Sequence, residues 1–237
     1  MPEPFTLLTG SAVPLLRDNI DTDTISPGSP PKRNGGGTAF GEHGSTTLAD
    51  DLFANWRYTP EGDPVPGFVL NQPRYQGSRI LLAGANFGCG SSRESAVWML
   101  AAWGIRCVVA PSFAEIFSAN CFANGLLPLA LSADVIVELA AEADTHGAFT
   151  VDLECSVVST PAGRAIPFQL SAYRRRGLLT GLDDIALTLS NPEQIEDYLV
   201  EGRSRSPWLY PAPGALAVRN VPPGQAGAAV TRTLGGA

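Results

Sequence analysis

Apolar residues gather in short runs through the middle of the chain, and stretches with helical spacing separate these runs. Residues 79–84, 105–110 and 126–131 are almost wholly apolar and predict three buried strands. Between them, residues 91–103 and 112–123 carry apolar side chains at helical spacing and end at Gly104 and at Asn124-Gly125. Strands and helices that alternate with short connections predict a parallel sheet built by right-handed crossovers.

The pattern is less regular on either side of this unit. Before it come two short apolar segments, a polar run at 18–27, and a stretch at 28–47 dense in Gly, Pro, Ser and Asn. Such a long loop is typically functional or disordered. After the unit, the pattern predicts a helix, three short strands with a hairpin turn at Pro161-Ala162-Gly163, and two closing helices. The predicted ranges are 132–143 for the first helix, 149–153, 156–159 and 165–170 for the strands, and 173–179 and 192–199 for the last helices.

The chain therefore reads as one domain with an appendage. Residues 1–209 are predicted to form the domain, and residues 210–237, rich in Gly, Ala and Pro, to form a flexible tail. The overall content of 44% hydrophobic and 16% charged residues is ordinary for a globular protein of 237 residues.

Charge and cysteine usage exclude several classes of function. The net charge of −7 argues against nucleic acid as a partner, which requires a basic face. The first residues lack the basic and apolar segments of a signal peptide, and no apolar run could span a membrane. The four cysteines and two histidines show no disulfide or zinc spacing. We expect a reduced, cytoplasmic protein that binds no metal by itself.

One segment carries the candidate chemistry. Residues 86–94, with the sequence NFGCGSSRE, connect the first buried strand to the helix predicted at 91–103. Ligands of open α/β sheets bind beyond the carboxyl ends of the strands, where a helix N-terminus offers free N–H groups. Gly88 and Gly90 allow close approach or positive φ, Arg93 adds a fork for a carboxylate, and Ser91 and Ser92 add hydroxyls. The segment predicts a site for an anionic substrate.

A purely structural interpretation of the same residues remains open. Ser91-Ser92-Arg93-Glu94 matches a capping box, in which Ser91 caps the helix and Glu94 reaches back to the N–H of Ser91. A phosphate-binding loop is less suitable, because GxxxxGK[ST] and the third glycine of a dinucleotide fingerprint are both missing. Spacing alone does not decide between a cap and a site.

The NFGCGSSRE segment resembles the active-site motif of the swivelling domain of the aconitase superfamily. More closely, the chain resembles the small subunits of 3-isopropylmalate dehydratases. The similarity covers about residues 5 to 209, and several separate stretches carry it in the same order. They are DTDTI at 21–25, FVLNQPRYQG at 68–77, APSFAEIF at 110–117, NGLLP at 124–128 and GLDDI at 181–185.

This resemblance implies a fold and a reaction. The fold is a swivelling β/β/α domain of the aconitase C-terminal type, with a mostly parallel central sheet in the α/β class. The reaction is that of a hydro-lyase in leucine biosynthesis, which interconverts 2-isopropylmalate and 3-isopropylmalate by dehydration and rehydration. A large partner subunit would carry a 4Fe–4S cluster and complete a heterodimer or larger hetero-oligomer, while this chain would hold no cofactor.

The resemblance also assigns roles to single residues. Ser91 corresponds to the family's serine base, Arg93 to a clamp for a substrate carboxylate, and Ser92 to a neighbouring hydrogen-bond partner. A basic residue from the loop after Ile25 can help to bind substrate in the superfamily, and Lys32 or Arg33 would serve here, although a solvated basic pair explains them as well. The remaining motif residues give support and are Asn86, Gly88, Gly90, Glu94 and Asp23.

Two departures from the family pattern affect these expectations. Ser95 stands where the family usually has a histidine, and residues 26–37 differ from the segment that recognises the substrate side chain in relatives. Another small dicarboxylate, such as a methyl-substituted malate or maleate, is therefore an alternative substrate, and a non-catalytic scaffold is an alternative function. Asp21, Thr22 and Asp23 fit a metal-binding run less well than a capped turn near the site.

Overall fold

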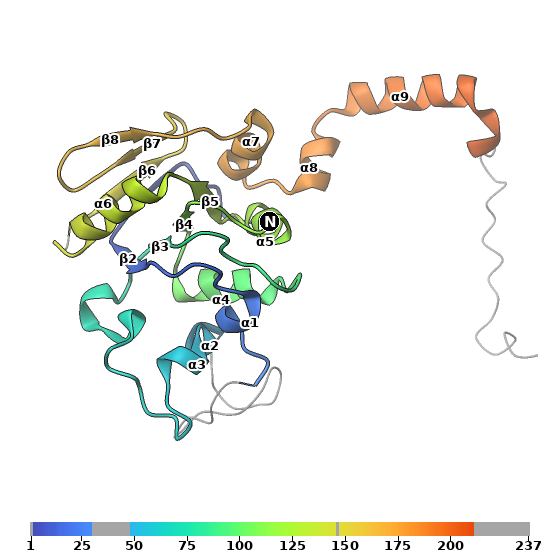
Figure 1. Cartoon of the computed structure of the whole chain (residues 1–237). Helices are drawn as coiled ribbons and strands as arrows, with labels where there is room; N and C mark the ends of the chain where they lie inside the picture. Colours follow the sequence, from blue (N-terminus) through green and yellow to red (C-terminus); the bar gives the residue numbers. More distant parts are fainter. Residues whose placement is uncertain (1, 30–47, 146, 211–237) are drawn as a thin grey trace, which may run out of the picture. The chain divides into compact units, whose positions relative to one another are not determined.

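The computed structural model describes residues 2–29, 48–145 and 147–210 of the chain. The chain divides into two compact units, Met1–Thr188 and Leu189–Ala237. The first unit contains two four-stranded sheets (Figure 1). The predicted boundary between a domain and a tail near residue 209 stays a prediction, because residues 211–237 lie outside the described part.

The first sheet is parallel and confirms the predicted α/β class. Its order is β2 (Ala12–Leu15), β3 (Ile80–Ala83), β4 (Cys107–Ala110) and β5 (Leu127–Ala130), and each neighbouring pair is parallel. The last three strands are those that the apolar runs predict. Its first strand comes from the short apolar segment near the N-terminus, which the sequence pattern does not single out as a strand.

The second sheet is antiparallel. Its order is β1 (Leu7–Gly10), β6 (Phe149–Asp152), β7 (Val157–Ser159) and β8 (Ala165–Pro167). Leu8 of β1 lies opposite Val151 of β6, so the N-terminal strand closes a sheet whose other strands come from residues 149–167. The hairpin between β7 and β8 turns at Gly163, whose φ of 83° confirms the predicted turn.

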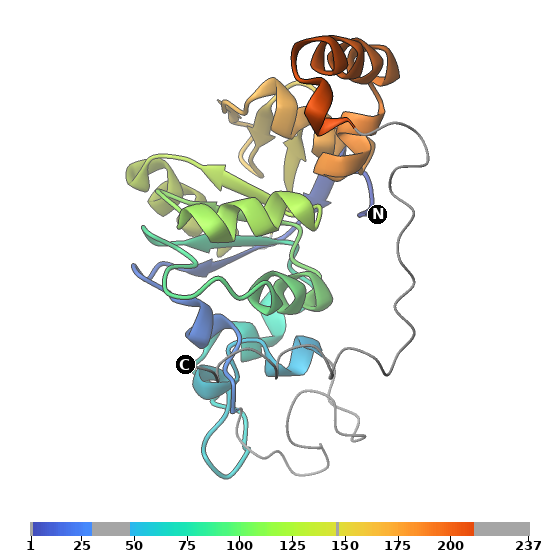
Figure 2. The ribbon, with the colours of Figure 1, turned by 90° about the vertical axis from the view of Figure 1, so that its right-hand side faces the viewer.

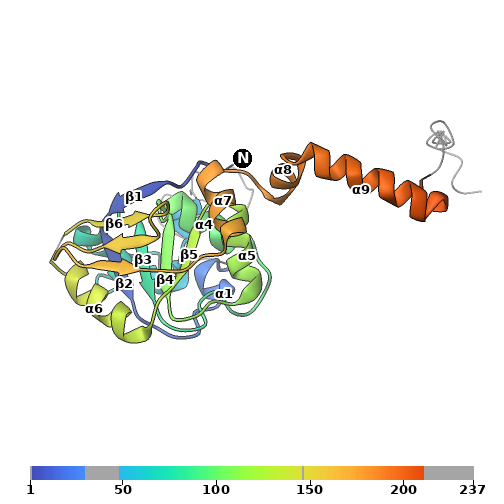
Figure 3. The same cartoon turned by 90° about the horizontal axis from the view of Figure 1, so that it is seen from above.

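Alternate residues of the parallel strands point to two separate cores, as the period of two along a strand requires. Leu81 and Val108 pack with α4 (Ser95–Trp103) and α5 (Glu115–Ala123) on one face. Leu82 and Val109 pack on the other face with α6 (Ala133–Ala143) and the antiparallel sheet. Figures 1 and 2 show these layers from the side, and Figure 3 shows the same unit from above, with the two sheets over one another.

Short helices complete the first unit. The α1 (Thr22–Ile25), α2 (Leu48–Asp51) and α3 (Ala54–Arg57) helices lie on the α4 side of the parallel sheet (Figures 1 and 2). Two 3₁₀ turns, Val69–Asn71 and Pro73–Tyr75, lead into β3, and α7 (Ala172–Thr180) and α8 (Asp184–Leu189) follow the antiparallel sheet. The second unit contains α9 (Pro192–Arg205) and the 3₁₀ turn Pro207–Leu209. None of the helices in the described ranges is long and apolar enough to cross a membrane.

Two predicted helices begin later than their sequence pattern suggests. The helix predicted from residue 112 begins at Glu115. The backbone of Phe87 forms hydrogen bonds with the residues before and after Phe113, and this bridge holds Phe113 extended. The helix predicted from residue 91 begins at Ser95, because a bridge between Asp21 and Cys89 holds the preceding chain alongside the N-terminal segment. These short bridges between distant segments compete with helix formation, and helical spacing does not reveal them.

Candidate active site

The loop that joins β3 to α4 lies alongside residues 18–22. Three backbone hydrogen bonds hold the two segments together. The N–H of Asn19 donates to the Ala85 carbonyl at 2.8 Å, that of Gly88 to the Ile20 carbonyl at 2.8 Å, and that of Thr22 to the Cys89 carbonyl at 2.9 Å. Because the loop follows the carboxyl end of β3, the arrangement brings α1 to that edge of the parallel sheet.

Glycines and asparagines give this loop its path. Gly88 has a φ of 76° and Gly90 a φ of 93°, and a Cβ at Gly88 would lie 2.1 Å from the Phe117 ring. Asn86 and Asn19 are also in the left-handed region, and the Asn86 Nδ2 donates to the Asn19 Oδ1 at 2.9 Å. The backbone conformation therefore favours glycine at both positions, and at Gly88 the close packing against Phe117 requires it as well.

Ser91 is exposed, and its neighbour Thr22 is buried. The two hydroxyl oxygens are 2.8 Å apart, and the Ser91 N–H donates to the Thr22 Oγ1 at 3.1 Å. The Thr22 hydroxyl also donates to the Ser91 carbonyl oxygen at 3.3 Å. Ser91 is thus an exposed residue whose hydroxyl is in contact with a buried one.

Arg93 is oriented by two acceptors from the α1 segment. Its Nη1 pairs with the Asp23 carboxylate and donates to the Ser26 carbonyl at 3.3 Å. Within the described residues, its Nη2 and Nε have no hydrogen-bond or ion-pair partner. The Arg93 side chain is 43% exposed, so as far as the described residues go these two nitrogens are available to an anion.

The capping-box interpretation of residues 91–94 is wrong. Glu94 is itself the N-cap of α4 and makes no side-chain cap hydrogen bond. Its Oε1 instead accepts from the Asn124 Nδ2 at 2.8 Å, which ties the start of α4 to the end of α5. Ser91, Ser92 and Arg93 therefore precede the helix, and their polar groups are not used to cap it.

Ser95 and Ser26 form a further contact that the sequence does not reveal. Their hydroxyl oxygens lie 2.9 Å apart, and Ser26 is buried. The residue in place of the usual family histidine is thus tied to the same Ser26 whose carbonyl holds Arg93. Thr22 and Ser26 belong to the site through contacts across 69 positions, and no local pattern predicts such pairing.

Two predicted contributors, Lys32 and Arg33, lie outside the described residues. In the described ranges, no group of three or more His, Cys, Asp or Glu side chains could hold a metal ion. Cys107 and Cys121 are buried, and burial raises the pKa of each thiol well above its ordinary value. A raised pKa disfavours the thiolate, which is the form of cysteine that binds a metal.

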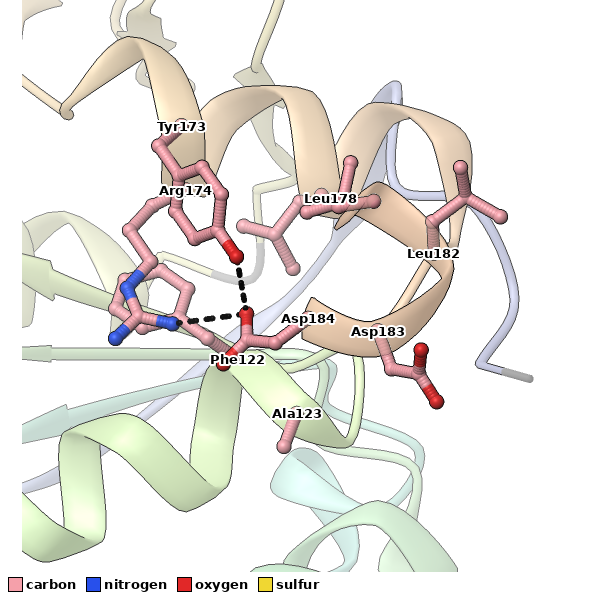
Figure 4. A pocket seen from close by; sticks show the side chains of 10 residues that line it. Phe122, Ala123, Tyr173, Arg174, Leu178, Leu182, Asp183 and Asp184 are labelled. Carbon is pink, nitrogen blue, oxygen red and sulfur yellow. Dashed lines mark hydrogen bonds and ion pairs between the residues drawn. The ribbon is translucent and has the colours of Figure 1, made fainter. Parts of the chain in front are cut away.

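A small pocket lies elsewhere in the first unit, between α7, α8 and the end of α5 (Figure 4). Asp184 accepts from the Tyr173 hydroxyl at 3.0 Å and pairs with the Arg174 guanidinium at 3.7 Å. Arg174 also lies over the Phe122 ring, 5.0 Å from its centroid. Tyr173, Arg174 and Asp184 are thus bonded to one another, and the pocket contains no residue of the 86–94 loop.

The protein is thus an α/β domain with a parallel sheet, and its candidate site is a serine and an arginine on the loop after β3. Comparison with known families shows to which of them this domain belongs. Residues 3–134 match the Aconitase C-terminal domain family, and the chain belongs to that family. The predicted resemblance is confirmed.

Three of the similar proteins carry the name 3-isopropylmalate dehydratase. The 3-isopropylmalate dehydratase small subunit of Rhodospirillum centenum is 47% identical over 211 residues, covering 87% of this chain and 98% of that protein. That of Cupriavidus necator is 49% identical over 213 residues, with coverages of 88% and 98%. A solved 3-isopropylmalate dehydratase from Methanocaldococcus jannaschii is 25% identical with a TM-score of 0.52, covering 81% of this chain and 99% of its own.

Proposed function

We propose that this chain is the small subunit of a hydro-lyase that interconverts 2-isopropylmalate and 3-isopropylmalate, a step of leucine biosynthesis in the cytoplasm. The observation that carries the proposal is the exposed pair of Ser91 and Arg93 on one loop. Each of the two side chains contacts a residue of α1. The common name of relatives that match over nearly their whole length supports the substrate.

Ser91 is the proposed base. As an alkoxide it would take a proton from the carbon next to a substrate carboxylate. The electron pair of the broken C–H bond would form the C=C bond, and the hydroxyl on the neighbouring carbon would leave with its own bonding pair. In rehydration of the opposite sense, Ser91 gives the proton to the carbon that lost the hydroxyl, and the hydroxyl is added to the carbon that lost the proton. An alkoxide of this kind requires strong local donors and exclusion of water.

Arg93 is the proposed carboxylate clamp. Its Nη1 is occupied by Asp23 and Ser26, which fixes the plane of the guanidinium. The Nη2 and Nε donors can then meet two carboxylate oxygens in the bidentate geometry that arginine favours. Because Arg93 and Ser91 are two positions apart on the same loop, binding of the carboxylate would bring its neighbouring carbon to the Ser91 oxygen. We propose Ser92 as a further hydrogen-bond partner of the substrate.

A large partner subunit is required by the proposal. Ser91 and Arg93 are exposed in the isolated chain, so water is excluded only when another surface covers them. The described residues do not provide a ligand set for an iron–sulfur cluster. We expect the 4Fe–4S cluster on the partner, where its open iron would act as a Lewis acid on the leaving hydroxyl.

The test is reconstitution with the large subunit from the same source, followed by assay of 2-isopropylmalate turnover. Ser91→Ala should lower kcat by at least about 100-fold, the usual scale for loss of a general base, and should leave complex formation intact. Ser159→Ala, an exposed serine on β7, is the control and should retain activity. A complex that forms but turns over no 2-isopropylmalate would contradict the substrate. An active Ser91→Ala enzyme would contradict the base.

A further inference from the structure

Thr22 makes more contacts with Ser91 than any other described side chain. Its Oγ1 is 2.8 Å from the Ser91 Oγ, accepts from the Ser91 N–H at 3.1 Å, and donates to the Ser91 carbonyl oxygen at 3.3 Å. Only 1% of Thr22 is exposed, whereas Ser91 is an exposed residue. A buried hydroxyl therefore meets every polar atom of the exposed serine.

The position of Thr22 is fixed independently of Ser91. Its N–H donates to the Cys89 carbonyl at 2.9 Å, and its own carbonyl accepts from the Ser26 N–H at 2.9 Å. The preceding Asp21 accepts from the Thr24 N–H at 2.7 Å and sets the turn. These bonds fix the backbone of Thr22, and in the observed rotamer its hydroxyl is directed at Ser91.

We propose that Thr22 is a positioning residue that donates its hydroxyl proton to the Ser91 alkoxide and so supports proton abstraction. A hydroxyl has one proton to donate and two acceptor lone pairs. The Ser91 N–H occupies one acceptor site of Thr22. The one proton of Thr22 is directed at the Ser91 carbonyl oxygen at 3.3 Å and can turn to the nearer Ser91 Oγ at 2.8 Å. When Ser91 loses its proton, Thr22 alone can donate across the 2.8 Å contact.

The bond gains strength in the state that catalysis needs. A hydrogen bond to a charged oxygen is about twice as strong as one between neutral groups, so Thr22 stabilises the alkoxide more than the resting hydroxyl. The Ser91 N–H that donates to Thr22 polarises the threonine hydroxyl further, as in other hydrogen-bond chains. The inference rests on the proposed function, because it assigns Thr22 to the same proton transfer.

The experiment uses the reconstituted two-subunit enzyme and measures kcat and KM for 2-isopropylmalate. Thr22→Val keeps the shape and removes the hydroxyl, and Thr22→Ser keeps the hydroxyl and removes the methyl group. We expect Thr22→Val to lower kcat about 10- to 100-fold, a loss smaller than the usual one when a strong oxyanion donor is removed. KM should stay within about threefold of the native value. Thr22→Ser should stay within about fivefold of the native kcat. Thr24→Val, in the same short helix, is the control and should change neither constant.

The outcomes separate the inference from the proposed function. A native complex that turns over no 2-isopropylmalate would contradict the proposed function. A native complex that is active, with Thr22→Val at the native kcat, would overturn the inference and leave the proposed function standing. Equal losses in Thr22→Val and Thr22→Ser, or a rise in KM alone, would show a role in packing and would also overturn it. If Thr22→Val does not assemble, Thr22→Ala replaces it and must show the same loss of kcat with rescue by Thr22→Ser.

Discussion

The pairing of Arg93 with Asp23 changes what the arginine can do for an anion. Both side chains are substantially exposed, 43% and 62%, so the ion pair is screened by solvent and contributes little to stability. Its effect is on geometry, because one nitrogen of Arg93 is held while the other two have no partner in the described part of the chain. A substrate carboxylate would then meet a guanidinium that is already oriented, which reduces the entropy lost on binding.

Tyr75 provides a pH-dependent contribution to stability at a distance from this chemistry. Burial raises the pKa of Tyr75 to about 12, with the hydrogen bond to Asp144 and the negative charge of Asp144 acting in the same direction. The unfolded tyrosine would ionise near its ordinary pKa of 10.0. Since the folded state holds the proton more tightly, this contribution is fully present below about pH 10 and is lost as the pH rises toward 12.

We expect Tyr75→Phe to reduce the loss of stability between pH 10 and pH 12. At neutral pH the variant should lose about 1 kcal/mol, the usual net value of one hydrogen bond. Urea unfolding at pH 7, 10 and 11 measures both effects, with the exposed Tyr198→Phe as the control. A fall in stability between pH 10 and pH 11 as steep as in the native chain would contradict the assignment to Tyr75.

At the scale of the elements, the path of the β3–α4 loop depends on Gly88. Its φ of 76° is unfavourable for any other residue, and a Cβ there would overlap the Phe117 ring at 2.1 Å. Phe117 is buried on α5 and stacks edge-on against Phe87 of the same loop, so it has little room to move. A side chain at Gly88 would push α5 and the loop apart and displace Ser91.

We expect Gly88→Ala to destabilise the fold by about 3 kcal/mol or more, because it adds a core overlap to the backbone cost. Gly77 is a matched control, since it has the same φ of 76° and no atom lies within 4 Å of the place that a Cβ would take. Gly77→Ala should cost only about 1–2 kcal/mol, the penalty of the left-handed conformation. Urea unfolding of both variants gives the comparison, and equal losses would show that the Phe117 contact is unimportant.

The helices and strands also show which parts of the fold could be predicted from the sequence. The strands β3, β4 and β5 are buried on both faces, so each appears as a continuous apolar run and could be predicted. The start of α4 could not be predicted, because Ser91 and Glu94 satisfy a local capping pattern while the observed hydrogen bonds run to Thr22 and Asn124. The motif predicts which loop carries the candidate site, but contacts between distant segments decide how its side chains are held.

At the scale of the whole chain, both hydrophobic cores belong to the first unit. The core between the parallel sheet and α4 and the core between that sheet and α6 contain buried residues from Phe5 to Leu178 only. No buried residue of either core comes from the described part of the second unit, which begins at Leu189. In α9 the only buried residue is Gly202, against which Tyr210 packs within the same unit. The two cores therefore require no described residue beyond α8.

A chain that ends at Ser190 keeps α8 whole and tests this separation. We expect it to retain its near-ultraviolet circular dichroism and to unfold in one cooperative urea transition, because its apolar cores are complete. Leu139→Ala in the full chain is the contrasting variant, since it removes a side chain that is 1% exposed in the α6 core and should cost about 2–5 kcal/mol. A truncated chain without fixed side-chain signals would show that the second unit is needed for the first to fold. If the truncated chain unfolds cooperatively but no longer binds the large subunit, the result would show that α9 contributes to assembly.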